Sequence, residues 1–420
     1  MQTDLSPVYA NDPDGLEAQK LLSNCVHCGF CTATCPTYQL LGDELDGPRG
    51  RIYLIKQMAE GAVATEKTRT HLDRCLTCRN CESTCPSGVQ YGHLLDIGRK
   101  WAEEQTPKRP AKERITRWLL KETLTRPALF EPAISLGRAI KPLLPSSLQK
   151  KIPSPYFSAS TNSQAKVVYQ ENMLLLEGCV QPGMLPNINQ ATRRVFEFLK
   201  IQLIAPSSAG CCGALRHHLN DHDGGLSDAR RNIDAWWPII EAQNITAIVM
   251  NASGCGVMVK DYGYLLRNDS EYAEKAQQMS VLTKDVSEII PSYIQQLIAQ
   301  VGAEVKPGIT YHPPCTLSHG QKIQGKVEDI LSQLGVRINL CENSHLCCGS
   351  AGTYSILQES LSNQLREQKL NHLLQACESN QSQYIASGNV GCITQLQNEE
   401  IPVVHWIEII DQLIMKKLNP

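Results

Sequence analysis

The chain has 420 residues, 42% of them hydrophobic and 20% charged, and its formal net charge at pH 7 is −2. This balance predicts a globular protein of several domains, and the near-neutral charge argues against nucleic-acid binding. No apolar run is long enough to predict a transmembrane helix, and the first residues lack the basic and apolar segments of a secretory signal. We therefore expect a cytoplasmic, reducing location, in which the 18 cysteines serve as metal ligands.

Two cysteine runs near the amino end share the pattern C-x2-C-x2-C-x3-C-P. They read Cys25-Val-His-Cys28-Gly-Phe-Cys31-Thr-Ala-Thr-Cys35-Pro36 and Cys75-Leu-Thr-Cys78-Arg-Asn-Cys81-Glu-Ser-Thr-Cys85-Pro86. This is the ligand pattern of bacterial ferredoxins with two [4Fe-4S] clusters, where three thiolates of one run wrap a cubane and the Cys before Pro in the other run supplies the fourth ligand. We predict that the first cluster is bound by Cys25, Cys28, Cys31 and Cys85, and the second by Cys75, Cys78, Cys81 and Cys35.

Two structural zinc sites and a disulfide framework are the alternatives for these runs. Zinc usually takes C-x2-C pairs, and disulfides are rare in a reducing compartment. We place the two-cluster ferredoxin-type domain at residues 1–105 and expect it to be mainly α-helical, because the distance from Cys35 to Cys75 exceeds what a compact β-rich ferredoxin needs. Arg49 and Arg51, between the runs, either offset the charge of a cluster or lie at the solvated start of a helix.

Prolines recur between short helical pieces from residue 106 to residue 165 and predict a helical connector. The mixture of apolar and basic residues from Trp118 to Ile152 either touches a membrane surface or packs against the neighbouring domain. We favour packing, because proline interrupts any long amphipathic helix in this stretch.

The chain repeats itself from residue 166 onward. Cysteines recur at a nearly constant offset, as from Cys179 to Cys315 and from Cys255 to Cys392, which indicates two copies of one domain, placed at 166–300 and 301–420. Short apolar runs alternate with helical stretches in each copy, so we expect an α/β fold built of βα units around a parallel sheet. Apolar runs end just before the first and last Cys of each copy, and the carboxyl ends of parallel strands meet at one edge. The cysteines of each copy should therefore converge.

The repeated sets are Cys179, Cys211, Cys212, Cys255 and Cys315, Cys347, Cys348, Cys392. Three interpretations stay open for them: further iron–sulfur clusters, zinc sites with four thiolates, and buried free thiols. We favour metal binding, with iron before zinc, because two matched sets are improbable by chance. Cys341 and Cys377 have no counterpart in the first copy and are expected in the core. The nearby histidines are expected to be neighbours of these sites rather than ligands: His217, His218, His319 and His345.

These residues resemble the iron–sulfur subunits of glycolate oxidases (glycolate dehydrogenases). The resemblance is carried by the two ferredoxin runs, by Asn232-Ile-Asp-Ala-Trp-Trp-Pro238 and by His345-Leu-Cys-Cys-Gly-Ser-Ala-Gly-Thr-Tyr354. More broadly, the tandem Cys-Cys-Gly domains are similar to those of heterodisulfide reductases, in which the last Cys is often followed by another in C-x-x-C. Met258 and Gln395 stand there in this chain, which leaves four thiolates in each set.

The resemblance implies an electron-transfer subunit that works with two FAD-binding dehydrogenase subunits. Those partners would oxidise glycolate to glyoxylate, and this chain would pass the electrons to a quinone or another acceptor, as a peripheral protein at the inner face of the cytoplasmic membrane. No nucleotide-binding or nucleophile motif is evident, so we expect no catalytic residue and no turnover of substrate by this chain alone. The alternatives are the equivalent subunit for lactate, another 2-hydroxy acid or glycerol 3-phosphate, and a heterodisulfide-reductase-like subunit.

Overall fold

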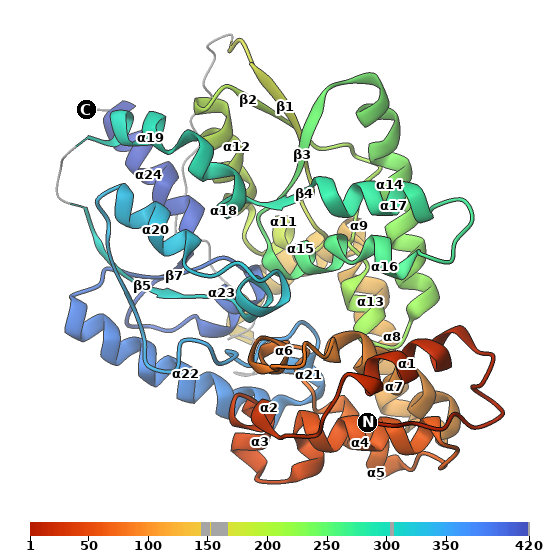
Figure 1. Cartoon of the computed structure of the whole chain (residues 1–420). Helices are drawn as coiled ribbons and strands as arrows, with labels where there is room; N and C mark the ends of the chain where they lie inside the picture. Colours follow the sequence, from red (N-terminus) through yellow and green to blue (C-terminus); the bar gives the residue numbers. More distant parts are fainter. Residues whose placement is uncertain (144–151, 153–166, 303–305, 419–420) are drawn as a thin grey trace.

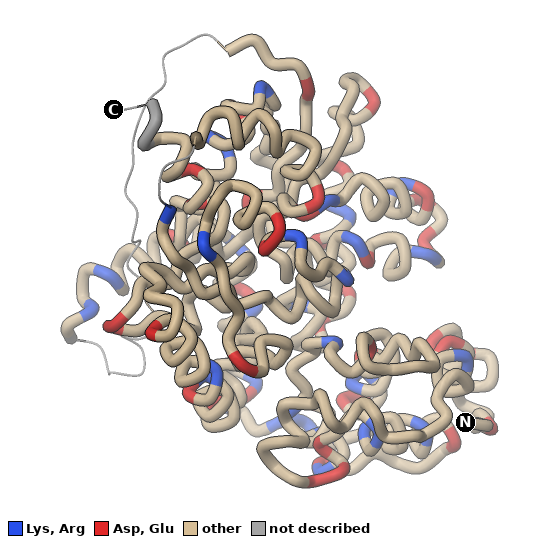
Figure 2. The backbone as a smooth tube through the Cα atoms, turned by 60° about the vertical axis from the view of Figure 1, so that its left-hand side comes forward, with Lys and Arg blue, Asp and Glu red and all other residues tan. Residues whose placement is uncertain are grey.

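The computed structural model of the chain describes residues 1–143, 152, 167–302 and 306–418. A helical amino-terminal module lies against two α/β units, each built on a four-stranded parallel sheet (Figure 1). The predicted fold class is thereby confirmed. Basic and acidic residues are interspersed along the described backbone (Figure 2). None of the described helices is both long and apolar enough to cross a bilayer.

The amino-terminal module is a bundle of short helices joined by the two cysteine runs. Its elements are α1 (Pro13–Ser23), α2 (Phe30–Ala33), α3 (Pro36–Leu41), η1 (Glu44–Asp46), α4 (Pro48–Ala59), α5 (Glu66–Asp73), α6 (Asn80–Thr84) and α7 (Tyr91–Gln105). Proline occupies the first turn of α1, α3 and α4, where its missing N–H has no partner to lose. The apolar faces of α1, α4 and α7 meet in a core that contains Leu22, Ile55, Leu94 and Trp101. This core fixes the helices from which the cysteine loops project.

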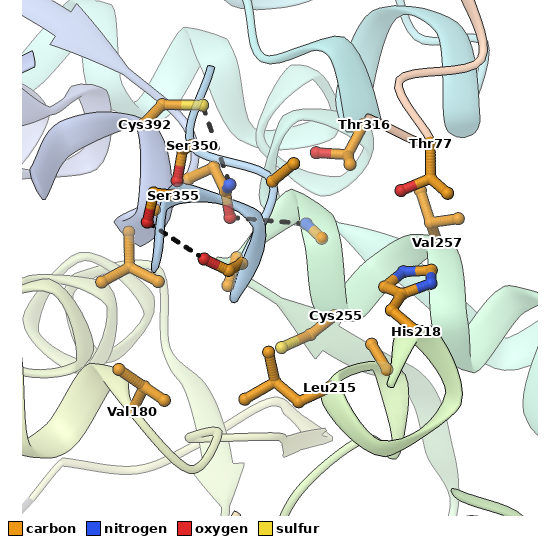
Figure 3. Close-up of a pocket in the computed structure, with 18 of the residues that line it drawn as sticks. Thr77, Val180, Leu215, His218, Cys255, Val257, Thr316, Ser350, Ser355 and Cys392 are labelled. Carbon is orange, nitrogen blue, oxygen red and sulfur yellow. Dashed lines mark hydrogen bonds between the residues drawn. The ribbon is translucent and has the colours of Figure 1, made fainter. Parts of the chain in front are cut away.

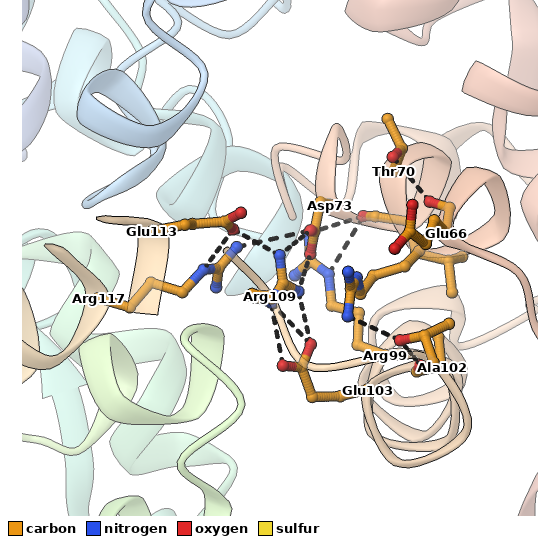
Figure 4. Close-up of polar contacts among 12 residues, drawn as sticks. Glu66, Thr70, Asp73, Arg99, Ala102, Glu103, Arg109, Glu113 and Arg117 are labelled. Carbon is orange, nitrogen blue, oxygen red and sulfur yellow. Dashed lines mark hydrogen bonds and ion pairs between the residues drawn. The ribbon is translucent and has the colours of Figure 1, made fainter. Parts of the chain in front are cut away.

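The connector begins with α8 (Ala111–Leu124), α9 (Pro127–Ala139) and η2 (Lys141–Leu143). A buried guanidinium clamps it to the module: Arg109 pairs with Asp73 at 2.6 Å, with Glu103 at 2.6 Å and with Glu113 at 2.6 Å (Figure 4). The rest of the predicted connector, at 144–151 and 153–165, lies outside the described residues.

The preference for packing is borne out on one face of the connector, where Phe130 and Ile134 lie against Gly183, and is wrong for the large apolar side chains of the other face. Trp118 is 56% exposed and Leu136 is 62% exposed, and α8 has no buried residue. Only Phe130 and Ile152 are buried among the apolar residues described between Trp118 and Ile152. The two helices pack on each other and on the protein through narrow faces, which leaves an apolar surface towards solvent.

The first α/β unit has the strand order β2-β1-β3-β4, with every strand pair parallel. Its strands are β1 (Glu171–Leu175), β2 (Ile201–Ile204), β3 (Ile245–Met250) and β4 (Thr283–Asp285). Its helices are α11 (Gln181–Met184), α12 (Pro186–Phe198), α13 (Ala214–His218), α14 (His222–Ala242), α15 (Ser253–Lys260), α16 (Tyr262–Leu265), α17 (Ala273–Leu282), α18 (Val286–Ile289), η3 (Ile290–Tyr293) and α19 (Ile294–Val301). β2 lies next to β1 towards one edge of the sheet, and β3 lies next to β1 towards the other edge, so the topological switch point is between β1 and β3.

The second unit repeats this topology in the order β6-β5-β7-β8, again all parallel. Its strands are β5 (Gly308–His312), β6 (Arg337–Leu340), β7 (Tyr384–Ser387) and β8 (Val403–His405). The helical elements are the π-helical turn η4 (Thr316–Gly320), α20 (Lys326–Gln333), α21 (Tyr354–Leu357), α22 (Glu359–Asn380), α23 (Val390–Leu396) and α24 (Trp406–Leu418). The switch point falls between β5 and β7.

One apolar core runs through both units. Val195 of α12 and Ile410 of α24 belong to a single cluster with residues of both sheets. At the edge of this contact Arg194 forms an ion pair with Asp411 at 2.7 Å. Because the units share a core, the carboxyl edges of their sheets are held in a fixed relation, and this positions the cysteines described below.

Candidate metal centres

The first ferredoxin-type group lies near the surface of the module. Cys25, Cys28, Cys31 and Cys85 line one small cavity, together with Arg49. Cys28 is exposed, and Cys31 and Cys85 are partly exposed. The structure therefore brings Cys85 of the second run to the first triplet, the arrangement on which the predicted ligand set depends.

The second group lies deeper. Cys35, Cys75, Cys78 and Cys81 line a neighbouring cavity and are all buried. The two runs face each other through α2 and α6, where the Asn80 side-chain amide donates to the carbonyl of Thr34 at 3.1 Å and the Thr84 hydroxyl donates to the Thr34 hydroxyl at 3.2 Å. This pairing places the last Cys of each run beside the triplet of the other.

Both cysteine loops have the same backbone conformation around their second cysteine. His27 and Gly29 flank Cys28 with φ of 58° and 88°, and Thr77 and Arg79 flank Cys78 with φ of 52° and 56°. Three of these four residues carry a side chain in the left-handed region, which costs roughly 1–2 kcal/mol each. Local strain of this kind persists where surrounding structure holds it, and here it turns three sulfurs of each run towards one point.

Arg51 is a buried cation at the second group. It is 0% exposed, lines the same cavity, and donates to the carbonyl of His71 at 2.7 Å and to the hydroxyl of Thr37 at 3.2 Å. Burial alone would lower the pKa of Arg51, but Cys75, Tyr91, Cys35 and Asp46 together raise it. Arg49 stays partly exposed and pairs with Glu44 at 2.6 Å. Of the two arginines between the runs, Arg51 has the position expected of a residue that offsets cluster charge.

The second group adjoins the second α/β unit. Cys78 belongs to one apolar cluster with Cys347 and Tyr354, and Cys315 packs against it. Hydrogen bonds hold this junction: the Tyr354 hydroxyl donates to the carbonyl of Arg74 at 3.2 Å, and the Ser83 hydroxyl lies 2.9 Å from Nδ1 of His319. The ferredoxin-type cysteines are thus in packing contact with those of the second repeated unit.

The two repeated cysteine sets share a single cavity of about 600 Å³, which all eight of their cysteines line. Figure 3 shows Cys255 of the first unit and Cys392 of the second on different walls of this cavity. The units touch here through Ser253, whose hydroxyl lies 2.7 Å from that of Thr316 and whose backbone N–H donates to the carbonyl of Gly388 at 3.2 Å. Convergence within each copy was expected from the strand ends; a common cavity was not.

The thiols of each set form a chain of contacts. Hydrogen bonding to Cys211 and burial raise the pKa of Cys179 well above its usual value. In the second unit the Cys315 and Cys347 sulfurs lie 3.8 Å apart, and this contact and burial raise the pKa of Cys315 in the same way. Four such thiols in contact become thiolates readily only beside a cation, so their chemistry fits an iron–sulfur group or zinc.

The glycine of each Cys-Cys-Gly motif is required by the backbone. Gly213 and Gly349 have φ of 93° and 84°, and a Cβ on either would lie 2.6 Å from a carbonyl oxygen, of Gly225 and of Ser362 respectively. The N–H of each glycine also donates to the first sulfur of its Cys pair, at 3.4 Å. The same backbone turn thus presents the adjacent cysteines in both units.

Comparison with known proteins assigns the chain to a family. A family model described as a 4Fe-4S dicluster domain matches residues 21–89, and one described as a cysteine-rich domain matches residues 173–260 and 309–397. The glycolate oxidase iron-sulfur subunit of Escherichia coli (strain K12) is 49% identical over 418 residues, covering 99% of this chain and 100% of that protein. The chain belongs to the glycolate oxidase iron-sulfur subunit family.

More distant relatives of this glycolate oxidase iron-sulfur subunit homologue carry two different names. The probable glycolate oxidase iron-sulfur subunit of Bacillus subtilis (strain 168) is 29% identical over 409 residues, covering 90% of this chain and 88% of that protein. Lactate utilization protein A of an Exiguobacterium species is 23% identical over 248 residues, covering 57% of this chain and 97% of that protein. The dicluster match spans both cysteine runs, so this member of the family is an iron–sulfur protein and a component of an oxidoreductase.

Several residues of this glycolate oxidase iron-sulfur subunit homologue behave as the sequence suggested, and others were missed. Cys341 and Cys377 lie in the apolar core, as expected. His319 has both ring nitrogens engaged, with Ser83 and with the carbonyl of His345. The missed residues are His312 and Lys369, which are buried beside the second set. A histidine ending an apolar strand three residues before Cys315 was the available signal for His312.

Proposed function

We propose that this chain is the electron-transfer subunit of a flavin-dependent glycolate dehydrogenase. It would take electrons from FAD-binding partner subunits that oxidise glycolate to glyoxylate, and pass them to a quinone or another acceptor. The observation that carries this proposal is the unbroken succession of cysteine groups, from exposed Cys28 through the buried second group to the shared cavity.

In this proposal each ferredoxin-type group holds one [4Fe-4S] cluster. Cys25, Cys28, Cys31 and Cys85 would hold the first, and Cys75, Cys78, Cys81 and Cys35 the second. A bound cluster supplies one-electron chemistry. The protein's part is to fix the thiolates, to keep water from the buried group, and to set its charge environment through Arg51. No side chain of this chain is assigned a catalytic role.

The cysteines of the repeated units would hold further metal. We favour iron–sulfur clusters at Cys179, Cys211, Cys212, Cys255 and at Cys315, Cys347, Cys348, Cys392. A pair of zinc sites that stiffen a docking scaffold is the second candidate. The cavity favours clusters, because both sets open into one space beside Cys78, where a redox centre would extend the path. A purely structural zinc site would gain nothing from a position next to the second ferredoxin-type group.

The face around the first group would receive the flavoprotein. Val26 and Phe30 are 68% and 62% exposed on either side of Cys28, and Tyr53 is 47% exposed beside them. His27 contacts the ring of Tyr53 in an edge-on arrangement. Exposed apolar residues that surround a near-surface redox site are typical of transient electron-transfer contacts.

The apolar face of α8 and α9 would touch the membrane, where a quinone dissolves. Ile115, Trp118 and Leu119 are exposed on α8, and Leu129 and Leu136 on α9. Lys112 and Arg114 are exposed on α8 as well, a composition suited to an anionic headgroup region. Flotation with anionic lipid vesicles tests this role: Trp118→Ser with Leu136→Ser should abolish flotation, while Val281→Ser, an exposed apolar residue elsewhere, should not.

The substrate of the complex is proposed from the relatives. The 49% identical protein is named for glycolate oxidase, whereas the relatives named for lactate utilization match 57% of the chain or less at 23–25% identity. We therefore favour glycolate and keep lactate as the second candidate. Rates of acceptor reduction by the assembled complex with each substrate separate them.

A substitution at the second group tests the relay. Cys78→Ser should leave reduction of the partner flavin by glycolate intact while abolishing electron transfer to the acceptor. Cys341→Ser, at a buried cysteine outside all four sets, is the matched control and should preserve both steps. Loss of flavin reduction in an assembled Cys78→Ser complex would show that this chain does more than relay electrons.

A further inference from the structure

His312 is a buried histidine whose ring lacks a hydrogen-bond partner among the described residues. It ends β5, is 1% exposed, and both of its ring nitrogens are left unsatisfied there. Leaving such a group unsatisfied is destabilising, and native proteins usually satisfy it with another polar group, a water molecule or an ion. Bulk solvent does not reach the ring, because all five residues of β5 are buried.

Two thiols of the second cysteine set lie close to the His312 ring. A ring nitrogen of His312 and the sulfurs of Cys348 and Cys392 all lie within 4.8 Å of one another. Donor atoms around a tetrahedral metal with bonds of about 2.0–2.3 Å lie roughly 3.3–3.8 Å apart. The three donors are therefore close to the spacing of a common coordination shell, and imidazole and thiolate are both ligands that iron and zinc accept.

The first unit has no equivalent of this nitrogen. Leu176 precedes Cys179 by the same interval as His312 precedes Cys315, and it packs in the apolar cluster that contains Cys212. The two sites therefore have matched cysteines, but only the second has an imidazole beside them.

A second difference accompanies the first. Lys369 on α22 is 3% exposed and donates to the carbonyl of Asn343 at 2.5 Å. Asn232 takes the corresponding place on α14 and donates to the carbonyl of Cys211 at 2.8 Å. At this helix position the second site has a buried cation and the first a neutral amide, so the two sites differ here in charge as well as in donor type.

We propose that His312 is a nitrogen ligand of the metal group bound by the second cysteine set. The second site is then a mixed site, with imidazole beside thiolates, and the first site is held by thiolates alone. The inference rests on the proposed function in one respect, namely that the repeated cysteines bind metal. It adds that the two repeated sites differ in their metal group and so occupy different places in the electron path.

Metal content of the full-length chain, purified anaerobically, tests the proposal. The two ferredoxin-type groups alone account for about eight irons. We expect metal beyond those eight in the wild-type chain, and loss of the same increment in Cys392→Ser and in His312→Leu, which introduces the residue of the first unit. His405→Leu is the matched control: His405 is also 1% exposed at the end of a strand, but it lies outside the group of three donors. It should keep the full content.

Isotope labelling tests the bond without any substitution. If the extra metal is iron, growth with ¹⁵N-histidine should change the nitrogen couplings of that centre in pulsed electron paramagnetic resonance. If it is zinc, X-ray absorption at the zinc edge should show nitrogen as well as sulfur ligands in the wild type, and sulfur alone at any zinc left in His312→Leu.

Three results would overturn the proposal: a wild-type chain with no metal beyond the eight irons, a His312→Leu chain that keeps its full metal content, or no directly bonded nitrogen at the extra metal. The first result would also remove the metal proposed for the repeated units, but it would leave the relay through the two ferredoxin-type groups standing. The other two results leave the proposed function standing in full, because the Cys78-dependent relay does not involve His312. Conversely, a failed relay would leave the ligand test unaffected.

Discussion

Replacing Arg51 by methionine should lower the reduction potential of the second ferredoxin-type cluster. Arg51 is the one fully buried guanidinium among the described residues that line that group. Two contacts in series connect it to a thiolate: Arg51 Nη2 lies 3.2 Å from the Thr37 hydroxyl, which lies 3.3 Å from the sulfur of Cys35. The guanidinium is therefore no more than two hydrogen-bond lengths from the cluster's ligand shell.

Coulomb's law gives the size of the effect. Unit charges separated by two such contacts, about 6.5 Å, interact by roughly 2.5 kcal/mol at an effective dielectric constant of about 20. Because about 1.4 kcal/mol corresponds to about 59 mV for one electron, removal of the cation should shift the potential by roughly 100 mV. The added electron spreads over the cluster, so a shift of about 50–100 mV to more negative values is expected.

Potentiometric titration of the reduced signals measures this shift in the full chain. Arg51→Lys keeps the charge and should retain most of the potential, although it loses the planar fork that binds His71 and Thr37. Arg49→Gln removes a partly exposed arginine that lines the cavity of the first group, and it should change the potential of the second cluster little, because solvent screens its charge. A potential that rises in Arg51→Met, or that moves equally in Arg51→Met and Arg51→Lys, would refute the electrostatic role.

Three further outcomes follow from the structure. Burial raises the pKa of Glu408 to about 7, so the carboxyl binds its proton more tightly in the folded state than in the unfolded state. The melting temperature of the chain should therefore fall as pH rises from 4.5 to about 7, and Glu408→Gln should reduce this dependence on pH. Gly349→Ala should destabilise the second unit by about 2–4 kcal/mol in thermal unfolding, because its Cβ meets the carbonyl of Ser362, whereas Gly325→Ala, at positive φ in open space, should cost about 1 kcal/mol. Phe30→Glu should weaken binding to the flavoprotein about tenfold or more in a titration, without loss of iron.

The local sequence pattern was enough to predict the ferredoxin-type module. Spacing alone paired Cys85 with the first triplet and Cys35 with the second, because a cubane needs a fourth ligand that neither triplet can supply. The apolar runs that became β1 and β5, before Cys179 and Cys315, predicted the parallel sheets, because buried strands joined by helical crossovers have few other arrangements.

Contacts between distant segments could not be predicted in this way. The shared cavity depends on how α12 and α24 pack the two α/β units on one core. The relative orientation of the two units is not encoded in any local sequence pattern. His312 is easily taken for a core residue in an apolar strand until Cys348 and Cys392 are found beside its ring. Proline in α8–α9 suggested a packed connector, but proline limits helix length and says nothing about which face is covered.

The most direct test of the relay is electron paramagnetic resonance of the anaerobically purified, fully reduced chain, with iron counted in the same sample. Two adjacent cubanes predict at least about eight irons and a spectrum broadened by spin coupling between two reduced clusters, which simplifies to an uncoupled signal in Cys85→Ala. Fewer than about eight irons, or a wild-type spectrum without coupling, would contradict the account.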